Sequence, residues 1–221
     1  MVLQLFKAVI FDWDGTLVDS TQVILTSFHK ALSEVDADVS DEFLARRIGI
    51  GTKLMIIDAL KENRVDFDEE YVEALIRTKL NYHVKLSFEA PIFDGAIKLL
   101  EELKGRVKIA LATMSNQIVI DKMLEDRNLT DYFNFVISAD AVKNPKPNPE
   151  VFLKTAHKLE VDPKECVVIE DSIFGVKAAK KAGMKCIAIP TGFYSKKELK
   201  KENPDLIADN VKDKKILRFI F

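Results

Sequence analysis

The stretch Lys-Ala-Val-Ile-Phe-Asp-Trp-Asp-Gly-Thr, residues 7–16, indicates the fold class. Its first half, Lys7 to Phe11, is a short and almost wholly apolar run, which is typical of a strand covered on both faces of a sheet. Asp12 and Asp14 follow directly, and open α/β sheets bind their ligands at the carboxyl ends of strands. A solvated Asp-Gly turn is the alternative interpretation. The stretch therefore predicts a buried strand that delivers two carboxylates to one sheet edge.

Similar apolar runs recur along the chain and alternate with helical periodicity, which predicts a parallel sheet. The runs are Val107 to Ala112, Phe135 to Ser138, Cys166 to Ile169 and Lys185 to Ile189. The intervening helices carry start signals at Asp94, at Asn148-Pro149 and at Ser172. Gly105 and Gly183 stand where two of them are expected to end. The fold class we predict is α/β, with a Rossmann-like doubly wound parallel sheet.

Between Leu17 and Ser87 the strand pattern disappears and amphipathic helical periodicity replaces it. An all-helical stretch directly after the first strand, in a chain that is otherwise α/β, indicates an inserted subdomain. We therefore predict an α/β core from residues 1–16 and 88–221, and a helical cap from residues 17–87. The hinges between them are expected near residues 17–19 and 88–93.

Composition narrows the classes of function. The 221 residues are 48% hydrophobic, which allows a substantial core. Lysine plus arginine (33) nearly balance aspartate plus glutamate (35), and no basic stripe occurs, so we expect no nucleic-acid partner. No run reaches the roughly 20 apolar residues of a membrane span, and residues 1–10 lack signal-peptide features. Cys166 and Cys186 have no paired spacing. We expect a cytoplasmic protein with a small-molecule partner, no membrane association, and either a monomeric or a homodimeric state.

Polar side chains follow other predicted strands where those strands end. Thr113 ends the second run, Glu170 and Asp171 end the fourth, and Lys146 lies in a Lys-Pro-Asn-Pro segment before a helix. Because the carboxyl ends of parallel strands meet at one edge, we expect these side chains to lie near Asp12. Core packing does not require two acid pairs, a hydroxyl and an ammonium. A phosphate bound to a magnesium ion does.

Mg²⁺ prefers hard oxygen ligands in octahedral geometry, and Asp12 and Asp171 are the candidate carboxylates. The Thr113 hydroxyl and the Lys146 ammonium are candidates for binding phosphate oxygens, together with the helix start at Asn116. Uncatalysed hydrolysis of phosphomonoesters is so slow that catalysis requires both charge neutralisation and a nucleophile. The pattern therefore predicts a Mg²⁺-dependent site that acts on a small phosphorylated molecule.

The Asp-Trp-Asp-Gly-Thr segment, Thr113, Lys146 and Glu170-Asp171 resemble the four ordered motifs of the haloacid dehalogenase superfamily. The resemblance extends from Phe11 to about Gly183. Four motifs in the same order are a specific signal, whereas one alone would be weak. The helical insert after the first motif resembles the cap of the phosphoglycolate phosphatase and β-phosphoglucomutase branch.

This resemblance implies roles for the individual residues. Asp12 would attack phosphorus, and Asp14 would protonate the leaving alkoxide and then activate water against the phosphoaspartate. Asp14 would also offer its backbone carbonyl to the metal, and Glu170 would join the metal ligands directly or through water. Thr16 and Ser115 are further candidates for phosphate or substrate binding. Superfamily members that act at carbon lack the second aspartate, so Asp14 implies phosphoryl chemistry.

The insert holds basic residues beside a glycine-flanked turn at residues 49–51. Arg46, Arg47 and Lys53 are positioned there to close over an anionic leaving group, and we take Arg47 and Lys53 as candidate substrate-binding residues. A solvated turn between two helices explains them equally well. The histidines fall in predicted helices without the spacing of a metal site, so we expect structural or surface roles for His29, His83 and His157.

Two other functions are compatible with these motifs. A non-enzymatic phosphoacceptor signalling domain also combines acids, a hydroxyl and a lysine around magnesium, but its acid pair stands on the first strand, whereas here Glu170-Asp171 comes last. A sugar-phosphate mutase such as β-phosphoglucomutase carries a cap histidine shortly after the first motif. This chain has Ile24 at about that position, with His29 more than one turn further along. Hydrolysis is therefore the expected reaction, and the sequence does not identify the phosphoester.

Overall fold

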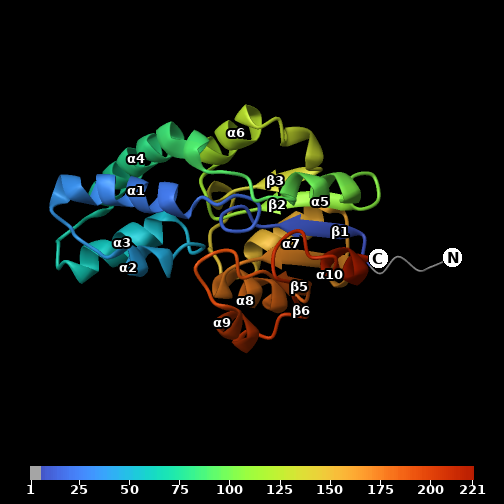
Figure 1. The fold of residues 1–221 in the computed structure, drawn as a ribbon. Coiled ribbons are helices and arrows are strands. Elements are labelled where there is room, and N and C mark those ends of the chain that lie inside the picture. Colours follow the sequence, from blue (N-terminus) through green and yellow to red (C-terminus); the bar gives the residue numbers. More distant parts are fainter. Residues whose placement is uncertain (1–5) are drawn as a thin grey trace.

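The computed structural model describes residues 6–221, so the expectation about a signal peptide in residues 1–10 lies partly outside the described residues. Within this range six parallel strands form one sheet in the order β3-β2-β1-β4-β5-β6 (Figure 1). The strands are β1 Ala8–Phe11, β2 Lys108–Ala112, β3 Phe135–Ile137, β4 Cys166–Glu170, β5 Lys185–Ala188 and β6 Leu206–Ile207. The chain order reverses on the two sides of β1, which makes the carboxyl end of this strand the place where such sheets bind ligands.

Helices cover both faces of the sheet, which confirms the doubly wound α/β fold. Side chains alternate along β1: Val9 and Phe11 pack in the layer under α5, α6 and α10, and Ala8 and Ile10 pack in the layer under α7, α8 and α9. These helices are α5 Ala96–Leu103, α6 Gln117–Asp126, α7 Glu150–Leu159, α8 Ile173–Lys181, α9 Lys196–Lys201 and α10 Lys215–Ile220. Because both strand faces are buried, the sequence shows unbroken apolar runs instead of alternation.

Two expected helix starts and one strand differ from the structure. Asp94 is not the cap of α5, because that helix begins at Ala96 with Gly95 in the left-handed region, and Asp94 instead pairs with Lys212 at 2.6 Å. At α7, Pro149 is the capping residue, and the Asn148 side chain accepts a hydrogen bond from the backbone N–H of the first helical residue at 3.0 Å. β6 was not expected, since two residues are too short to produce a period.

The segment after β1 forms a separate helical layer, drawn to the left of the sheet in Figure 1. It consists of α1 Thr21–Leu32, α2 Asp41–Ala45, α3 Thr52–Glu62 and α4 Glu69–Leu86, which we call the cap. The cap has an apolar cluster of its own, and the side chain of Phe174 from α8 packs against it. Short 3-10 turns complete the chain at Ser33–Val35, Ser87–Glu89, Thr130–Tyr132, Ala139–Ala141 and Pro163–Glu165.

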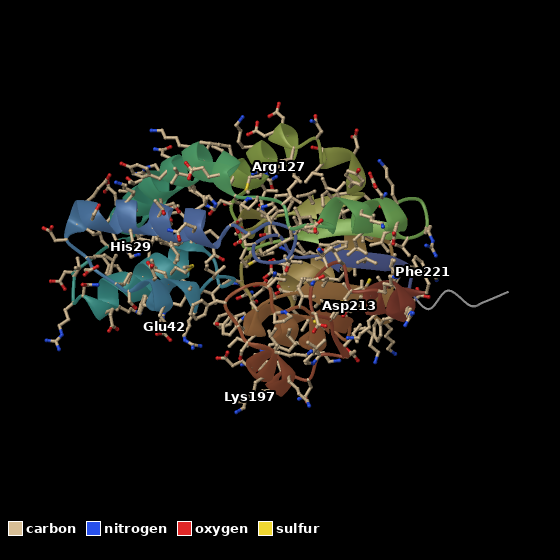
Figure 2. All side chains as sticks on the ribbon, in the orientation of Figure 1. His29, Glu42, Arg127, Lys197, Asp213 and Phe221 are labelled. Carbon is tan, nitrogen blue, oxygen red and sulfur yellow. The ribbon has the colours of Figure 1, made fainter. Side chains whose placement is uncertain are left out.

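The two segments that join the cap to the core lie side by side. The backbone N–H of Asp19 donates to the carbonyl of Pro91 at 2.9 Å, and the N–H of Phe93 donates to the carbonyl of Leu17 at 3.0 Å. Arg127, at the end of α6 (Figure 2), donates to the carbonyls of Ser87 and Ala90 in the second segment, at 2.7 Å each. Two hydrogen-bonded crossing segments thus connect the cap to the core.

Further contacts join the cap to the core around the site. The Tyr194 hydroxyl donates to the backbone carbonyl of Arg46 at 2.5 Å, and the Arg46 guanidinium pairs with Glu198 at 3.1 Å. On the opposite side, the Thr52 hydroxyl donates to the Asn116 side chain at 2.9 Å. The cap therefore lies directly over the carboxyl ends of β1 and β2.

Three further features are the state of the thiols, the packing of the C-terminal segment and the length of the helices. Cys166 and Cys186 are buried and free, and burial raises the pKa of both thiols. Ile216 and Ile220 of α10 are buried, so the apolar C-terminal segment is a packed element. None of the helices within residues 6–221 is long and apolar enough to cross a bilayer.

Candidate active site

The centre of the site is Lys146, which is fully buried at the carboxyl edge of the sheet. Its ammonium donates to Asp12 Oδ1 at 2.7 Å, to Glu170 Oε1 at 2.6 Å and to the carbonyl of Ala112 at 3.2 Å. These partners come from the ends of three neighbouring strands, β1, β4 and β2. The predicted convergence of strand ends is therefore present, and Lys146 fixes the orientation of the Asp12 carboxylate.

Glu170 is the most heavily hydrogen-bonded acid of the site. Its Oε2 accepts from the backbone N–H of Asp171 at 3.1 Å and from both the N–H and the hydroxyl of Ser172 at 3.0 Å each, while Oε1 accepts from Lys146. The α8 backbone passes so close that a Cβ on Gly175 would fall 1.7 Å from Oε1. Glu170 is thus held on both oxygens by protein donors, which suits a residue that orients its neighbours.

Asp171 lies on the other side of the same edge. Its Oδ1 accepts from the Thr16 hydroxyl at 3.2 Å. A Cβ on Gly15, whose φ is +75°, would fall 2.3 Å from Asp171 Oδ2, and one on Gly192 would fall 1.8 Å from it. Only glycine therefore fits at these two positions, and the backbone leaves Asp171 just enough space beside Asp12.

Asp12, Glu170 and Asp171 form a buried group that fits a divalent cation. One carboxylate oxygen from each lies within 4.8 Å of the others. Burial raises the pKa of Asp12 and Asp171, and the neighbouring carboxylates raise both further, whereas Lys146 lowers them. Three carboxylates face a single ammonium, so the site has an excess of negative charge that Mg²⁺ with its oxygen ligands would neutralise.

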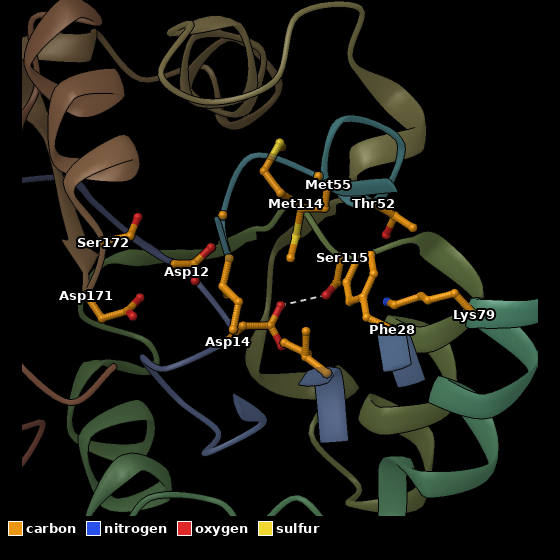
Figure 3. A pocket seen from close by; sticks show the side chains of 14 residues that line it. Asp12, Asp14, Phe28, Thr52, Met55, Lys79, Met114, Ser115, Asp171 and Ser172 are labelled. Carbon is orange, nitrogen blue, oxygen red and sulfur yellow. Dashed lines mark hydrogen bonds between the residues drawn. The ribbon is translucent and has the colours of Figure 1, made fainter. Parts of the chain in front are cut away.

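Asp14 occupies a different environment from Asp12. The Ser20 hydroxyl donates to its Oδ1 at 2.6 Å, and the Ser115 hydroxyl donates to its Oδ2 at 2.5 Å. Figure 3 shows the Asp14 side chain turned toward Ser115 and away from Asp171. Trp13, between the two acids in the chain, points into the core, where its indole N–H contacts Met123 Sδ at 3.3 Å. The two acids of the first motif therefore lie in different surroundings.

Other candidates from the sequence have defined positions that are less exposed to a substrate. The Thr113 hydroxyl accepts from the backbone N–H of Ser115 at 3.0 Å, so it shapes the turn that presents Ser115. Asn116 is held between Thr52 and Asp140, at the contact of cap and core. Thr16 donates to Asp171, as described above. These three side chains support the residues that line the cavity.

A small cavity of about 30 Å³ lies between the acids and the cap, which leaves room for only about two water molecules. Core and cap both contribute to its wall (Figure 3). The core supplies Asp12, Asp14, Met114, Ser115, Asp171 and Ser172. The cap supplies Ile24, Phe28, Ile48, Gly49, Gly51, Thr52, Met55 and Lys79.

Ser20 and Lys79 are among the polar residues of this site that the sequence analysis missed. Ser20 lies four residues after Thr16, the last residue of the first motif, and has no distinguishing pattern. Lys79 did have a signal, because it continues the buried face of α4 that Val72 and Leu75 begin, at helical spacing. A lysine in register with apolar residues is the kind of exception that indicates a site.

Arg47 and Lys53, the candidate substrate-binding residues of the cap, lie away from the cavity. Neither lies on the cavity wall: the Arg47 guanidinium pairs with Asp58 at 3.1 Å and stacks on Phe43, and Lys53 pairs with Glu69 at 3.0 Å and with Glu73 at 3.2 Å. Acidic neighbours within the cap hold both cations on its outer surface. The glycine-flanked turn itself does reach the cavity, through the backbone.

Comparison with known proteins places the chain in a family. A family model described as haloacid dehalogenase-like hydrolase matches residues 9–189. The chain belongs to this family. It is similar to members of the phosphoglycolate phosphatase and β-phosphoglucomutase branch: Phosphoglycolate phosphatase 1 of Pseudomonas aeruginosa is 27% identical over 212 residues, which cover 94% of this chain and 78% of that protein.

Two further similarities agree with the family. The crystal structure of β-phosphoglucomutase from Clostridium difficile superposes with a TM-score of 0.87 at 28% identity, covering 97% of this chain and 96% of that one. The chloroplast protein SUPPRESSOR OF QUENCHING 1 of Arabidopsis thaliana is 33% identical over 210 residues, but the chain spans only 20% of its length. This haloacid dehalogenase-like hydrolase is an enzyme of the phosphatase type.

Proposed function

We propose that the protein is a Mg²⁺-dependent phosphomonoester hydrolase that forms a phosphoaspartate on Asp12 and acts on a small phosphorylated metabolite. The observation that supports this most is the division between the first two acids. Asp12 is bonded to Lys146 within the buried carboxylate group, whereas Asp14 lies outside that group and is held by two hydroxyls on the cavity wall. A nucleophile and an acid/base residue require such different surroundings.

In the first step, Asp12 attacks phosphorus as the ester P–O bond breaks, and Asp14 donates a proton to the departing alkoxide. In the second step, Asp14 takes a proton from a water molecule that attacks phosphorus, which releases phosphate and restores the Asp12 carboxylate. Lys146 orients Asp12 and favours its ionised form, because the ammonium lies 2.7 Å from Oδ1. Ser115 holds Asp14 in place and presents its backbone at the phosphate position.

Asp12 and Asp171 would hold the metal, with the backbone carbonyl of Asp14 as a further ligand. Glu170 would assist directly or through water, and the four protein donors on its oxygens favour the indirect role. When bound, Mg²⁺ would stabilise the negative charge that develops on the phosphoryl oxygens. Thr16 would keep Asp171 oriented toward this position through its 3.2 Å hydrogen bond.

The surroundings of Ile24 favour hydrolysis over mutase chemistry. A mutase needs a cap group that manages the proton of a second substrate hydroxyl, and the residue at the corresponding place here, Ile24, is an apolar part of the cavity wall. His29 does not replace it, because it does not line the cavity and lies 2.7 Å from Asp41 on the cap surface, labelled in Figure 2. A phosphoacceptor signalling role is also disfavoured, because the cap covers Asp12 and an acid/base residue stands beside it.

The cap, residues 17–87, is proposed to move. The cavity of about 30 Å³ is too small for a phosphomonoester with its leaving group, so the substrate must enter when the cap is displaced. Rotation at the paired segments near residues 17–19 and 88–93 would open it without breaking the apolar cluster of the cap. Closure would then exclude bulk water from the phosphoaspartate.

Phosphate release from p-nitrophenyl phosphate tests the proposed function. We expect activity with Mg²⁺, loss of activity after treatment with a chelator, and restoration when Mg²⁺ is added back. Asp12→Asn and Asp171→Asn should each abolish turnover while the folded structure persists by circular dichroism. Rapid quench with a ³²P-labelled substrate should trap label on Asp12. Undiminished hydrolysis by the metal-free protein, or label on another residue, would contradict the proposal.

A further inference from the structure

Lys79 is a buried cation of the cap that faces the active-site cavity. It lies on α4, is almost fully buried, and forms part of the cavity wall opposite the acids of the core (Figure 3). Among residues 6–221, no carboxylate lies within ion-pair distance of its ammonium. Its contacts are the Nδ1 of His83 at 2.7 Å and the ring face of Phe28, 5.0 Å from the centroid.

A lysine without a carboxylate partner is unusual at this position of the helix. Val72, Leu75, Lys79 and His83 are the buried residues of α4 and follow one another at intervals of three or four, so they form one face. Val72 and Leu75 pack in the apolar cluster of the cap, whereas Lys79 lines the cavity. An unpaired ammonium in this place is energetically unfavourable, and such costs are common at functional sites.

His83 fixes the direction of the ammonium. Because Lys79 donates to Nδ1, the imidazole is neutral and carries its hydrogen on Nε2, which has no hydrogen-bond partner among the described residues. Burial lowers the pKa of His83 well below its usual value, and the charge of Lys79 lowers it further. His83 therefore acts as a fixed acceptor behind the ammonium and leaves the other N–H groups of Lys79 for the cavity.

The acids of the core do not neutralise this charge. Burial lowers the pKa of Lys79 to about 8 and outweighs the opposite effect of the Asp14 charge, so the ammonium is charged at neutral pH. Both carboxylate oxygens of Asp14 already accept hydrogen bonds from Ser20 and Ser115. The ammonium thus lacks a protein counter-ion and faces the place where a leaving group would lie.

The rest of the cap wall restricts the kind of leaving group. Ile24, Phe28 and Met55 are apolar, and the hydroxyl of Thr52 already donates to Asn116, so most hydroxyls of a sugar would be buried there without partners. Lys79 is the one cation among the residues that line the cavity, and a second phosphate, with a charge near −2, would be only half neutralised by it. A single carboxylate on a short carbon skeleton matches both the charge and the apolar surroundings.

We propose that Lys79, held by His83, binds a carboxylate on the leaving group and makes the protein specific for small phosphorylated carboxylic acids. This rests on the proposed hydrolase function, since it concerns the leaving-group side of the same cavity. Lys79 is the specificity-determining residue, and His83 is a positioning residue that acts through it.

Substrates matched in size test the proposal. 2-Phosphoglycolate carries a carboxylate where 2-hydroxyethyl phosphate carries a hydroxymethyl group. p-Nitrophenyl phosphate, which has neither, reports the phosphate-transfer chemistry itself. In the wild type we expect kcat/KM to favour phosphoglycolate. Lys79→Met should lower kcat/KM for phosphoglycolate by about 10- to 100-fold, mainly through KM, and change the other two substrates less than about threefold. Lys85→Met, an exposed lysine of the same helix, is the matched control and should change none of them.

The role of His83 is tested by two substitutions. His83→Leu removes the acceptor behind the ammonium and should raise KM for phosphoglycolate alone, whereas His83→Asn keeps an oxygen near the position of Nδ1 and should restore it in part. Thermal melting curves show whether each variant is folded. If both variants behaved alike on all three substrates, His83 would be a packing residue and its positioning role would be wrong.

An assay without turnover separates this inference from the proposed function. The chain has three histidines, so their ring signals can be assigned by NMR. Adding glycolate should shift the His83 signals in the wild type and not in Lys79→Met, while ethylene glycol should shift neither. If no substrate were turned over but glycolate still shifted the His83 signals, the hydrolase function alone would be refuted. A wild type that prefers 2-hydroxyethyl phosphate, or equal losses of Lys79→Met on all substrates, would overturn the inference about Lys79.

Discussion

Two lysines of this protein are buried to the same degree and have opposite surroundings. Lys146, in the core, is 1% exposed, and Lys79, in the cap, is 3% exposed. Burial lowers the pKa of each, but at Lys146 the charges of Asp12 and Glu170 outweigh burial, so the pKa rises above its usual value. At Lys79 burial outweighs the charge of Asp14, and the pKa falls to about 8.

The different surroundings indicate that Lys146 takes part in the reaction and that Lys79 recognises the substrate. Lys146 is neutralised by the protein itself, so its ammonium orients Asp12 whatever the substrate is. Lys79 is not neutralised within the described residues, so its partner must come from outside the chain. The core would then perform a reaction common to many phosphoesters, and the cap would select among them. The predictions below test this division, in order of decreasing effect.

Asp14→Asn should affect every substrate equally, because Asp14 belongs to the core chemistry. We expect a loss of kcat on the order of 10²- to 10⁴-fold for 2-phosphoglycolate and for p-nitrophenyl phosphate alike, since general acid and base catalysis are both removed. Steady-state phosphate release measures this loss. A loss confined to one of the two substrates would mean that Asp14 recognises the substrate, and it would contradict the division of roles between core and cap.

Lys146→Met should destabilise the fold. Removing the ammonium leaves Asp12 and Glu170 as buried carboxylates without a counter-charge, which costs about 3–5 kcal/mol when one partner of a buried pair is lost. Urea unfolding in the presence of a chelator measures the free energy, and added Mg²⁺ should recover part of it. An unchanged midpoint without metal would mean that the acids are neutralised by protonation instead.

Lys79→Met should change the free energy of unfolding in the opposite direction to Lys146→Met. We expect it to stabilise the protein by about 1–3 kcal/mol at pH 7, because an unpaired buried charge is removed. Below pH 8 the folded and unfolded chains both hold the Lys79 proton, so the full cost of burying the charge is present. Between pH 8 and pH 10.5 the folded wild type releases the proton first, and its stability rises relative to the variant. Unfolding curves at several pH values should show the difference shrinking over this window. A difference that is independent of pH would contradict the charged state of Lys79.

Arg47→Ala and Lys53→Ala should have the smallest effects. Both cations form ion pairs on the outer surface of the cap, and exposed pairs contribute about 0–1 kcal/mol. KM for phosphoglycolate should stay within about twofold of the wild type in both variants, against the sequence-based expectation that they bind the leaving group. A large rise in KM would show that the cap rearranges when substrate binds.

The strand ends were accessible from the sequence because the signals are local. Each buried parallel strand appears as an unbroken apolar run, and the polar residue that follows it must lie at the sheet edge, so Asp12, Thr113 and Glu170 could be assigned together. Element boundaries were less accessible: Gly95 replaced Asp94 as the cap of α5 because Asp94 pairs with Lys212, more than a hundred residues later. A local pattern cannot include such a partner.

The cap was accessible as a helical insertion, but its substrate-facing residues were not. Basic residues beside glycines suggested Arg47 and Lys53, and the structure turns both outward to acids of the cap. Lys79 was overlooked because an isolated lysine in an amphipathic helix is ordinarily a solvated residue. Which face of α4 covers the active site depends on how α1, α3 and the core pack against it, and that is a property of the whole fold.

The sequence by itself determined the sheet, the helical insertion and the order of the catalytic motifs, because periodicity and strand-end polarity depend on neighbours in the chain. Only the tertiary structure decided which charges are compensated. The sequence does not show how the charges of Lys146 and Lys79 are compensated: two acids at strand ends surround the first ammonium, while an imidazole and an aromatic ring surround the second. Electrostatic compensation acts through space over a few ångströms, so it is fixed only when distant segments of the chain meet.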